Sequence, residues 1–288
     1  MSRRRLALAL ALALGSVPFA GSAPVAAADD DLLPDLKMAP IYEVRIERSA
    51  IGRKRLRFGT IVWNVGRGPL EVRADGRVGA TMTNIRQWIA SPGGAGYESP
   101  QPNSAAFYSG DGHNHWHIGH FVVAALLQAP GGPPIEPRYL RKIGFCLTDL
   151  VRVPAALRPP GSPTRIGYPV RGCGIRASTS LHMGISVGFG DDYKPYFAHQ
   201  AVDVTGLAAG TYRLCATVNG DGMWQEIDHV ANNSYWLDLA VDPALNQVRV
   251  VGQGEDPCGA QPEPIFYGCG AVAASAIAAR QERFFCQL

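Results

Sequence analysis

Four of the seven histidines in this 288-residue chain fall within eight residues, at positions 113, 115, 117 and 120. His113, His115 and His117 are two residues apart, so an extended chain would point their three imidazoles to the same side. Neutral imidazole is the commonest protein ligand for transition metals, and three of them without a thiolate suit copper(II) or zinc. The spacing therefore predicts a three-histidine metal site, with His120 facing away from it.

The backbone that carries these histidines must bend. In a straight strand the outer two Cα atoms would lie about 13 Å apart, which is too far for a shared shell with bonds of about 2 Å. The flanking Gly112 and Gly119 would permit a bend. The alternative is an exposed, histidine-rich strand without a metal, but Trp116 would be an unusual residue in such a strand. A metal site alone leaves catalysis, storage and a structural role open.

The elements that position this site are expected to be strands. Only 18% of the residues are charged, and 33 glycines and 22 prolines indicate many turns. Short runs with strand character recur along the chain, and we expect 56–65 and 70–73 to form a hairpin across the turn at 66–69. Long loops are expected at 91–109 and 129–137, and the only convincing helix is 271–280. The pattern predicts an all-β, sandwich-like fold. The expected strands are 42–48, 56–65, 70–73, 121–127, 182–187, 201–204, 211–218, 235–241 and 247–251.

The first 28 residues have the features of a signal peptide: three arginines at 3–5, an apolar run at 6–14 and small residues at 26–28. The alternative, a membrane anchor, is disfavoured by the short apolar run. We therefore expect a secreted, periplasmic or cell-surface protein without stable membrane insertion. Removing the leader arginines leaves 24 basic residues against 24 acidic ones. Such a balance argues against nucleic-acid binding, and it leaves the substrate and the oligomeric state open.

Six cysteines in an exported chain predict up to three disulfides. Their positions suggest that Cys146 pairs with Cys173 and Cys258 with Cys269, which leaves Cys215 to pair with Cys286. We expect residues 242–288 to form a C-terminal extension stapled by disulfides, with the short helix inside it.

Three segments together resemble the lysyl oxidase family. The run from His113 to His117 is similar to the family's copper-binding His-x-His-x-His motif. The segment 142–149 resembles the one that carries its cofactor lysine, and 193–205 resembles the one that carries its cofactor tyrosine. The likeness extends from about residue 33 to 241, so it implies a lysyl oxidase-like catalytic domain over residues 29–241.

By this resemblance, His113, His115 and His117 would hold Cu(II). Tyr193 would be oxidised by copper and O₂, and the amine of Lys142 would add to the resulting quinone to give lysine tyrosylquinone. The implied activity is oxidative deamination of a primary amine, either peptidyl lysine or a small amine, to an aldehyde with release of H₂O₂ and ammonia. Without the resemblance, Tyr193 would be interpreted as a loop tyrosine and Lys142 as a solvated surface cation.

A calcium site is a further implication of the resemblance. The family has an acidic segment before an Asn-Asn pair that binds calcium together with an N-terminal Asp-Leu, and oxygen ligands of this kind suit Ca²⁺. This chain carries one extra residue before the pair, and a polar β-turn is the alternative. The corresponding residues are Asp35, Leu36, Glu226, Asp228, Asn232 and Asn233.

The general base stays open at this stage. The candidates are Asp191, Asp192, His199, Asp203 and His120. Two other functions also stay open: a copper- or zinc-binding protein on the same fold without a quinone, and a zinc hydrolase that uses the three histidines.

Overall fold

The computed structural model describes residue 28 and residues 30–109, 113–119, 121–140, 144–228 and 231–258. The predicted signal peptide, apart from residue 28, and the predicted helix at 271–280 lie outside these residues. His120 and Lys142 lie outside them as well.

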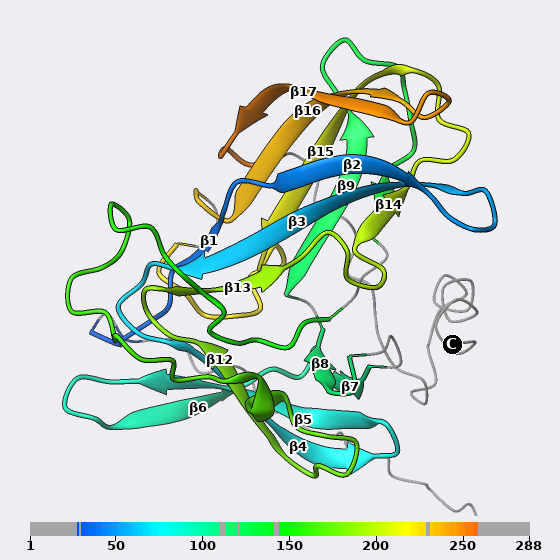
Figure 1. Cartoon of the computed structure of the whole chain (residues 1–288). Helices are drawn as coiled ribbons and strands as arrows, with labels where there is room; N and C mark the ends of the chain where they lie inside the picture. The colour runs from blue at the N-terminus through cyan, green and yellow to red at the C-terminus, as the bar shows by residue number, and fades with distance from the viewer. Residues whose placement is uncertain are drawn as a thin grey trace, which may run out of the picture.

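The described residues form three antiparallel sheets and one short 3₁₀ helix, η1 (Val170–Cys173), so the all-β prediction is confirmed (Figure 1). In the first sheet β3 is central and pairs with four other strands; its members are β1 (Leu36–Met38), β2 (Tyr42–Arg48), β3 (Lys54–Asn64), β11 (Val151–Arg152), β13 (Phe189–Tyr193) and β14 (Ala201–Asp203). The second sheet has the order β10 (Arg138–Tyr139), β9 (Val122–Gln128), β15 (Gly210–Val218), β16 (Ser234–Asp242), β17 (Gln247–Gly254). The third has the order β12 (Leu181–Ile185), β4 (Leu70–Val78), β5 (Thr81–Ala90), β7 (Ala106–Tyr108), β8 (Trp116–Ile118), with β6 (Gly96–Pro100) also paired to β5.

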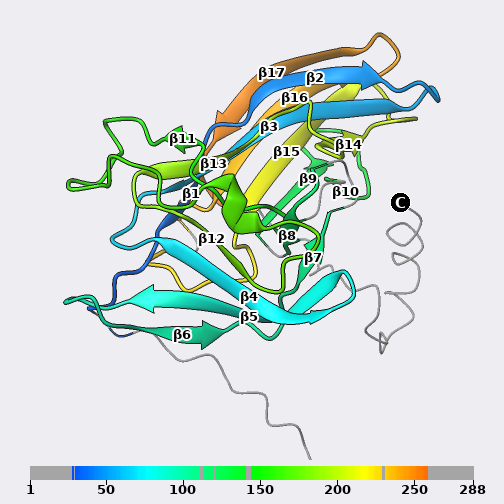
Figure 2. The ribbon, with the colours of Figure 1, turned by 60° about the horizontal axis from the view of Figure 1, so that its bottom comes forward.

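One hydrophobic core joins the three sheets. Along β16, buried Tyr235, Leu237, Leu239 and Val241 alternate with half-buried residues, as expected for a strand with one face on a core. Their cluster also includes apolar residues of β3 and β4. Both ribbon views place β2 of the first sheet beside β17 of the second, and these two strands are in contact (Figure 2). The three sheets therefore share one core, and β8, which carries His117, is the last strand of the third sheet.

The expected hairpin between 56–65 and 70–73 is wrong, because β4 pairs with β5 and β12 and not with β3. The turn at 66–69 leads the chain from the first sheet to the third. Here the backbone of residues 32–35 passes so close that a Cβ at Gly66 would lie 2.3 Å from Asp35 N, and one at Gly68 would lie 1.7 Å from Leu32 O. The two glycines permit this close crossing, so they do not mark a hairpin turn.

Two disulfides are present among the described cysteines. Cys146 pairs with Cys173 as predicted, with Cα atoms 5.6 Å apart. Cys215 pairs with Cys258 at a Cα–Cα distance of 5.8 Å, so the predicted Cys258–Cys269 and Cys215–Cys286 pairs are wrong. The reason is that β17 runs back along β16, which brings Cys258 to Tyr235 and so beside β15. Cys269 and Cys286 lie outside the described residues.

The two disulfides indicate an extracytoplasmic location, because reducing compartments do not maintain structural disulfides. In the part of the chain that the structure describes, no helix has the length and apolar character needed to cross a membrane.

Candidate metal centre

His113, His115 and His117 converge as predicted. Each offers one ring nitrogen, and these three nitrogens lie within 4.8 Å of one another. The Nε2 atoms of His115 and His117 are 3.1 Å apart, and the three ring centroids are separated by 5.0 to 5.6 Å. His117 is buried, and the other two are half-buried. The cluster could therefore bind a metal ion, and its all-imidazole composition suits copper.

The bend that the spacing required is made at Asn114. This residue has φ of +56°, a left-handed conformation that asparagine adopts more readily than most side chains. Extended backbone begins only at Trp116, so His113 is turned back toward the other two histidines. Gly112 lies outside the described residues, and Gly119 has no positive φ. A bend therefore lies inside the motif, at a residue that the sequence does not single out; Gly119 does not make it, and Gly112 is untested.

Trp116 anchors the motif from its other side. Its side chain is fully buried, and its indole N–H donates to Ile175 O at 2.8 Å. Since neighbouring residues of a strand point in opposite directions, burying Trp116 fixes the side on which His117 emerges.

The segment 144–146 lies against the histidine cluster. Gly144 has φ of +70°, and a Cβ there would lie 2.5 Å from Phe107 Cζ and 3.0 Å from His117 Cβ. Phe145 and Ile118 exchange both backbone hydrogen bonds, at 2.8 and 2.9 Å. Gly144 is thus packed against His117, a predicted metal ligand, and Phe145 is paired with β8, the strand that carries His117.

Tyr193, the last residue of β13, contacts the same segment. Only 5% of its surface is exposed, which contradicts the interpretation as a loop tyrosine. Its ring centroid lies 4.5 Å from that of Phe145, and its hydroxyl accepts a hydrogen bond from Cys146 N at 2.5 Å and donates to Cys146 O at 3.3 Å. Phe197 lies between Tyr193 and the histidines, with ring centroids 6.0 Å from Tyr193 and 5.0 Å from His113.

Of the five candidates for a general base, two are engaged in structural contacts. Asp192 is buried and accepts from Tyr42 and Lys194. Asp203 accepts from Arg53 and Thr205 at the edge of the first sheet. Asp191 is buried on the face of β13 that also carries Tyr193, because the two are two residues apart. His199 is half-buried with φ of +62°, and His120 lies outside the described residues. Among the described residues Asp191 and His199 remain as candidates, and His120 stays an untested one.

The predicted calcium ligands also gather, between the N-terminal segment and the end of the 219–233 loop. Glu226 Oε2 accepts from Leu36 N at 2.7 Å, and its Oε1 accepts from Asn233 Nδ2 at 2.7 Å. Asp35 Oδ1 accepts from Asn232 Nδ2 at 2.7 Å. Residues almost two hundred positions apart are thus joined by polar contacts.

The charges and unpaired oxygens of this group fit a hard cation. Burial raises the pKa of Glu226 to about 7. Hydrogen bonds from Leu36 N, Asn219 Nδ2 and Asn233 Nδ2 act in the opposite direction, because they favour the ionised form. Burial also raises the pKa of Asp35, and the charge of Asp228 adds to this rise. The buried Oδ1 atoms of Asn232 and Asn233 have no hydrogen-bond donor. A cation would balance the carboxylates and coordinate such oxygens. The carboxylate oxygens of this group do not lie as close together as the histidine nitrogens. Among the described residues, the three histidines form the only group of three or more His, Cys, Asp or Glu residues whose ligand atoms all lie within 4.8 Å of one another.

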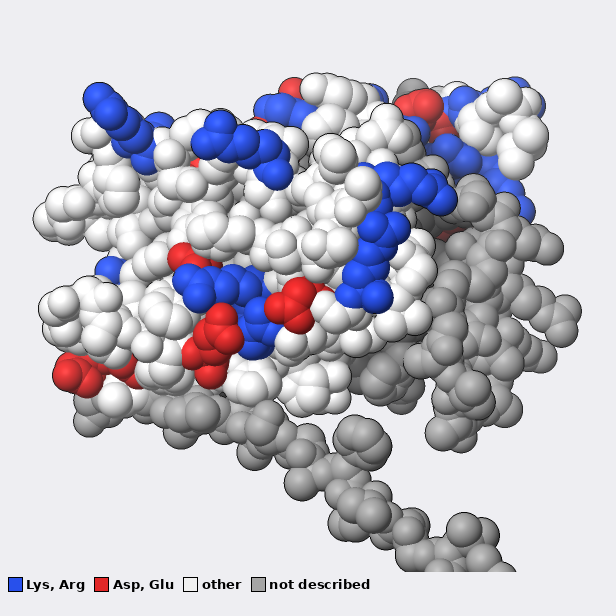
Figure 3. Space-filling view, turned by 90° about the horizontal axis from the view of Figure 1, so that it is seen from below, with Lys and Arg blue, Asp and Glu red and all other residues white. Residues whose placement is uncertain are grey.

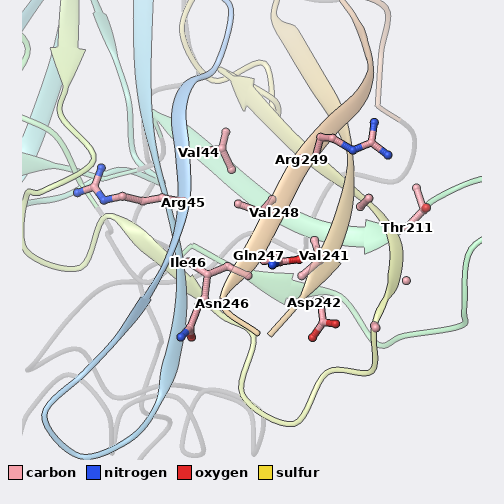
Figure 4. Close-up of a pocket in the computed structure, with 13 residues that line it drawn as sticks. Val44, Arg45, Ile46, Thr211, Val241, Asp242, Asn246, Gln247, Val248 and Arg249 are labelled. Atoms are coloured by element: carbon pink, nitrogen blue, oxygen red, sulfur yellow. The ribbon is translucent and has the colours of Figure 1, made fainter. Parts of the chain in front are cut away.

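A groove of about 750 Å³ lies elsewhere, between β2 and the β16–β17 hairpin (Figure 4). Val44, Ile46 and Val248 contribute apolar surface, and Arg45 and Arg249 stand at its rim. None of the predicted site residues lines it, so it is not a candidate active site.

Sequence reasoning missed the residues that connect the parts of the site: Asn114, Phe145 and Phe197. All three lie within the motifs that carry the family resemblance, so their positions were a usable signal. Comparison with known proteins adds no assignment, because no protein-family model and no curated protein matches this chain.

Proposed function

We propose that this chain is a secreted, copper-dependent amine oxidase of the lysyl oxidase kind. It would deaminate primary amines, either peptidyl lysine or small amines, to aldehydes, with release of H₂O₂ and ammonia. Residues 29–241 would form a sandwich-like catalytic domain, preceded by a signal peptide and followed by the extension 242–288. Support comes from three motifs in the family's order along the chain.

The observation that carries the proposal is the position of residues 144–146. Gly144 packs against His117, and Cys146 is hydrogen-bonded to the Tyr193 hydroxyl. Lys142 is two residues before Gly144, a distance that a chain spans with at most about 7 Å. Lys142 itself lies outside the described residues, and its approach to the Tyr193 ring is part of the proposal.

The donor set fits copper, since three imidazoles without carboxylates or thiolates are a typical Cu(II) environment. Copper held by His113, His115 and His117 would supply, with O₂, the redox chemistry that converts the Tyr193 phenol to a quinone, whose carbonyl then serves as electrophile and electron sink.

The chain's own residues supply the surroundings that this chemistry needs. Phe145 and Phe197 pack edge-on against the Tyr193 ring and limit access of water to it. A dry environment also favours the neutral, nucleophilic form of a lysine amine. The backbone of Cys146 orients the Tyr193 hydroxyl. Asp191 or His199 would accept the proton that leaves the substrate carbon.

The alternative is a copper- or zinc-binding exported protein without a quinone. It is favoured by the hydrogen bonds between the Tyr193 hydroxyl and the Cys146 backbone, which suit a structural tyrosine. The zinc-hydrolase hypothesis has less support, because among the described residues no carboxylate oxygen joins the histidines within 4.8 Å.

The test is redox-cycling quinone staining of the copper-loaded protein. We expect a signal from the wild type and none from Tyr193→Phe or Lys142→Arg. Matched controls are Tyr196→Phe, which changes an exposed tyrosine, and Lys54→Arg in β3; both should stain like the wild type. Equal staining of all five proteins, or staining of none with copper bound, would refute the oxidase proposal, and the second result would favour the alternative.

A further inference from the structure

A basic and apolar surface lies behind the histidine motif, on the side of Trp116. Residues 151–180 contain five arginines and neither aspartate nor glutamate, in a protein whose basic and acidic residues balance once the leader is removed. The Cys146–Cys173 disulfide ties this segment to residue 146, and η1 packs against β12. The concentration of positive charge is therefore local and fixed in place.

Exposed aliphatic residues stand directly beside the arginines of this surface. The pairs are Arg77–Val78, Val170–Arg171 and Ile175–Arg176, and we call these six residues the basic–apolar patch. Val78, Val170 and Ile175 are 73%, 47% and 66% exposed. Single exposed aliphatic residues are common on protein surfaces, so what distinguishes these three is that each is adjacent to an arginine and that they gather in one place.

Contacts around Trp116 bring the pairs together. Arg77 lies over the Trp116 ring at 5.6 Å and donates to Ser178 O at 3.3 Å, while Trp116 itself donates to Ile175 O. Arg176 lies over the ring of Tyr108 at 5.5 Å, and that ring packs against Trp116. The pair Val170–Arg171 begins η1, which leads to Ile175. Residues of β4 and of the 170–178 segment thus form one surface.

No carboxylate in the described part of the chain forms an ion pair with the arginines of the basic–apolar patch. Among the described residues, Arg77, Arg171 and Arg176 form no ion pair, in contrast to Arg73 and Arg86 on the same sheet, which pair with Glu71, Glu98 and Asp75. On the face seen from below, basic and acidic side chains interleave in one cluster, and other basic side chains stand among uncharged residues (Figure 3).

We propose that the basic–apolar patch docks on the surface of a membrane that contains anionic phospholipids. Arginine pairs with phosphate through two parallel hydrogen bonds, and aliphatic side chains beside it can enter the boundary between headgroups and acyl chains. A soluble anionic polymer would use the arginines but would leave Val78, Val170 and Ile175 in water. The alternation of charge and exposed aliphatic surface therefore favours a lipid surface.

Co-sedimentation with lipid vesicles tests the proposal, using the full mature chain. We expect binding to vesicles of phosphatidylcholine mixed with phosphatidylglycerol, and none to phosphatidylcholine alone. The variant Arg77→Gln/Arg171→Gln/Arg176→Gln should bind on the order of a hundredfold more weakly, since each basic residue at a membrane surface contributes about a factor of five to ten. The control Arg45→Gln/Arg48→Gln/Arg249→Gln removes the same charge from β2 and β17 and should bind like the wild type.

A second variant, Val78→Ser/Val170→Ser/Ile175→Ser, keeps every charge. It should also bind more weakly, and the loss should persist at high salt, where the electrostatic part is screened. Unchanged melting temperatures would show that the variants fold. The proposal is overturned if the wild type does not bind the vesicles, or if both arginine variants lose binding equally. It is also overturned if the serine variant binds vesicles like the wild type and the wild type binds polyglutamate in a salt-sensitive way. The last result would assign the patch to an acidic polymer.

Discussion

His117 is the most enclosed of the three histidines, with 1% of its surface exposed. It touches Phe107 edge-on at 5.9 Å between ring centroids and has Gly144 against its Cβ. A buried imidazole held on two sides can adopt few orientations, so it is pre-organised as a ligand, whereas the half-buried His113 and His115 can adjust to the ion.

Replacing His117 tests this role. We expect His117→Ala to weaken copper binding by more than about 100-fold, because even residues that only orient metal ligands are worth 10–100-fold in affinity. Copper per chain would be measured by elemental analysis after dialysis against a competing chelator. His182→Ala is the control, because His182 Nε2 lies 3.1 Å from Glu71 Oε1 in the third sheet and not in the cluster. Equal copper retention by both variants would contradict the assignment.

Glu226 makes a prediction about pH and calcium. The pKa of Glu226 in the folded protein is about 7, above the usual 4.5. Without a cation, the folded state therefore binds a proton more tightly than the unfolded state does between pH 4.5 and pH 7. Stability should then fall by about 3 kcal/mol as the pH rises through this window. Calcium should restore stability above pH 7 and have little effect at pH 5.

Thermal unfolding at several pH values, with calcium and with a chelator, would check this expectation. Glu226→Gln should abolish both the pH dependence and the calcium effect. Glu136→Gln changes an exposed glutamate and is the control. If calcium stabilises the wild type and Glu226→Gln equally, the ion binds elsewhere.

At the scale of elements, the segment 144–146 connects the third sheet to β13 through its contacts with β8 and Tyr193. Gly144 is the position where this connection is tightest, because it combines a left-handed backbone with two close neighbours.

Gly144→Ala should therefore destabilise the fold and weaken copper binding together. Gly161 has a similar φ of +77°, but a Cβ there would meet nothing within 4 Å. Gly161→Ala thus carries only the backbone strain, about 1 kcal/mol, whereas Gly144→Ala adds an overpacking cost of about 1–3 kcal/mol. Denaturant unfolding and copper titration of the two variants measure the difference. Equal losses would show that the close contact at Gly144 has no consequence.

The sequence predicted those strands whose residues alternate between apolar and polar, such as β15 and β16. An alternation every second residue indicates a strand with one buried and one exposed face. It did not predict β13, since Gly190, Asp191 and Asp192 are typical of a turn, although Asp191 and Asp192 are buried here. The motif also indicated which histidines converge but placed the bend at glycines. A left-handed Asn114 is a local choice that the surrounding packing decides, so spacing alone could not locate it.

At the scale of the whole molecule, the two disulfides have different tasks. Cys215–Cys258 fastens the end of β17 to the second sheet, which carries none of the three predicted metal-binding histidines. Cys146–Cys173 fastens both the segment that contacts Tyr193 and the base of the basic–apolar patch. The sequence prediction paired Cys215 and Cys258 wrongly because their proximity depends on the tertiary fold. Only the return of β17 along β16 brings Cys258 near Cys215.

Removing each disulfide in turn separates stability from site assembly. The loops they close predict losses of roughly 3–4 kcal/mol for either one. We expect Cys215→Ala/Cys258→Ala to lower the free energy of unfolding but keep copper binding, and Cys146→Ala/Cys173→Ala to lower both. Denaturant unfolding and copper titration would show this. Loss of copper binding in the first variant only would contradict the division of tasks.

The central claim is that Lys142 and Tyr193 become covalently joined beside the histidine cluster. Peptide mass spectrometry after proteolysis of copper-loaded, air-exposed protein tests it most directly. We expect one cross-linked species that contains both the Lys142 and the Tyr193 peptides, and that is absent when copper is withheld. Two separate, unmodified peptides from fully copper-loaded protein would contradict it.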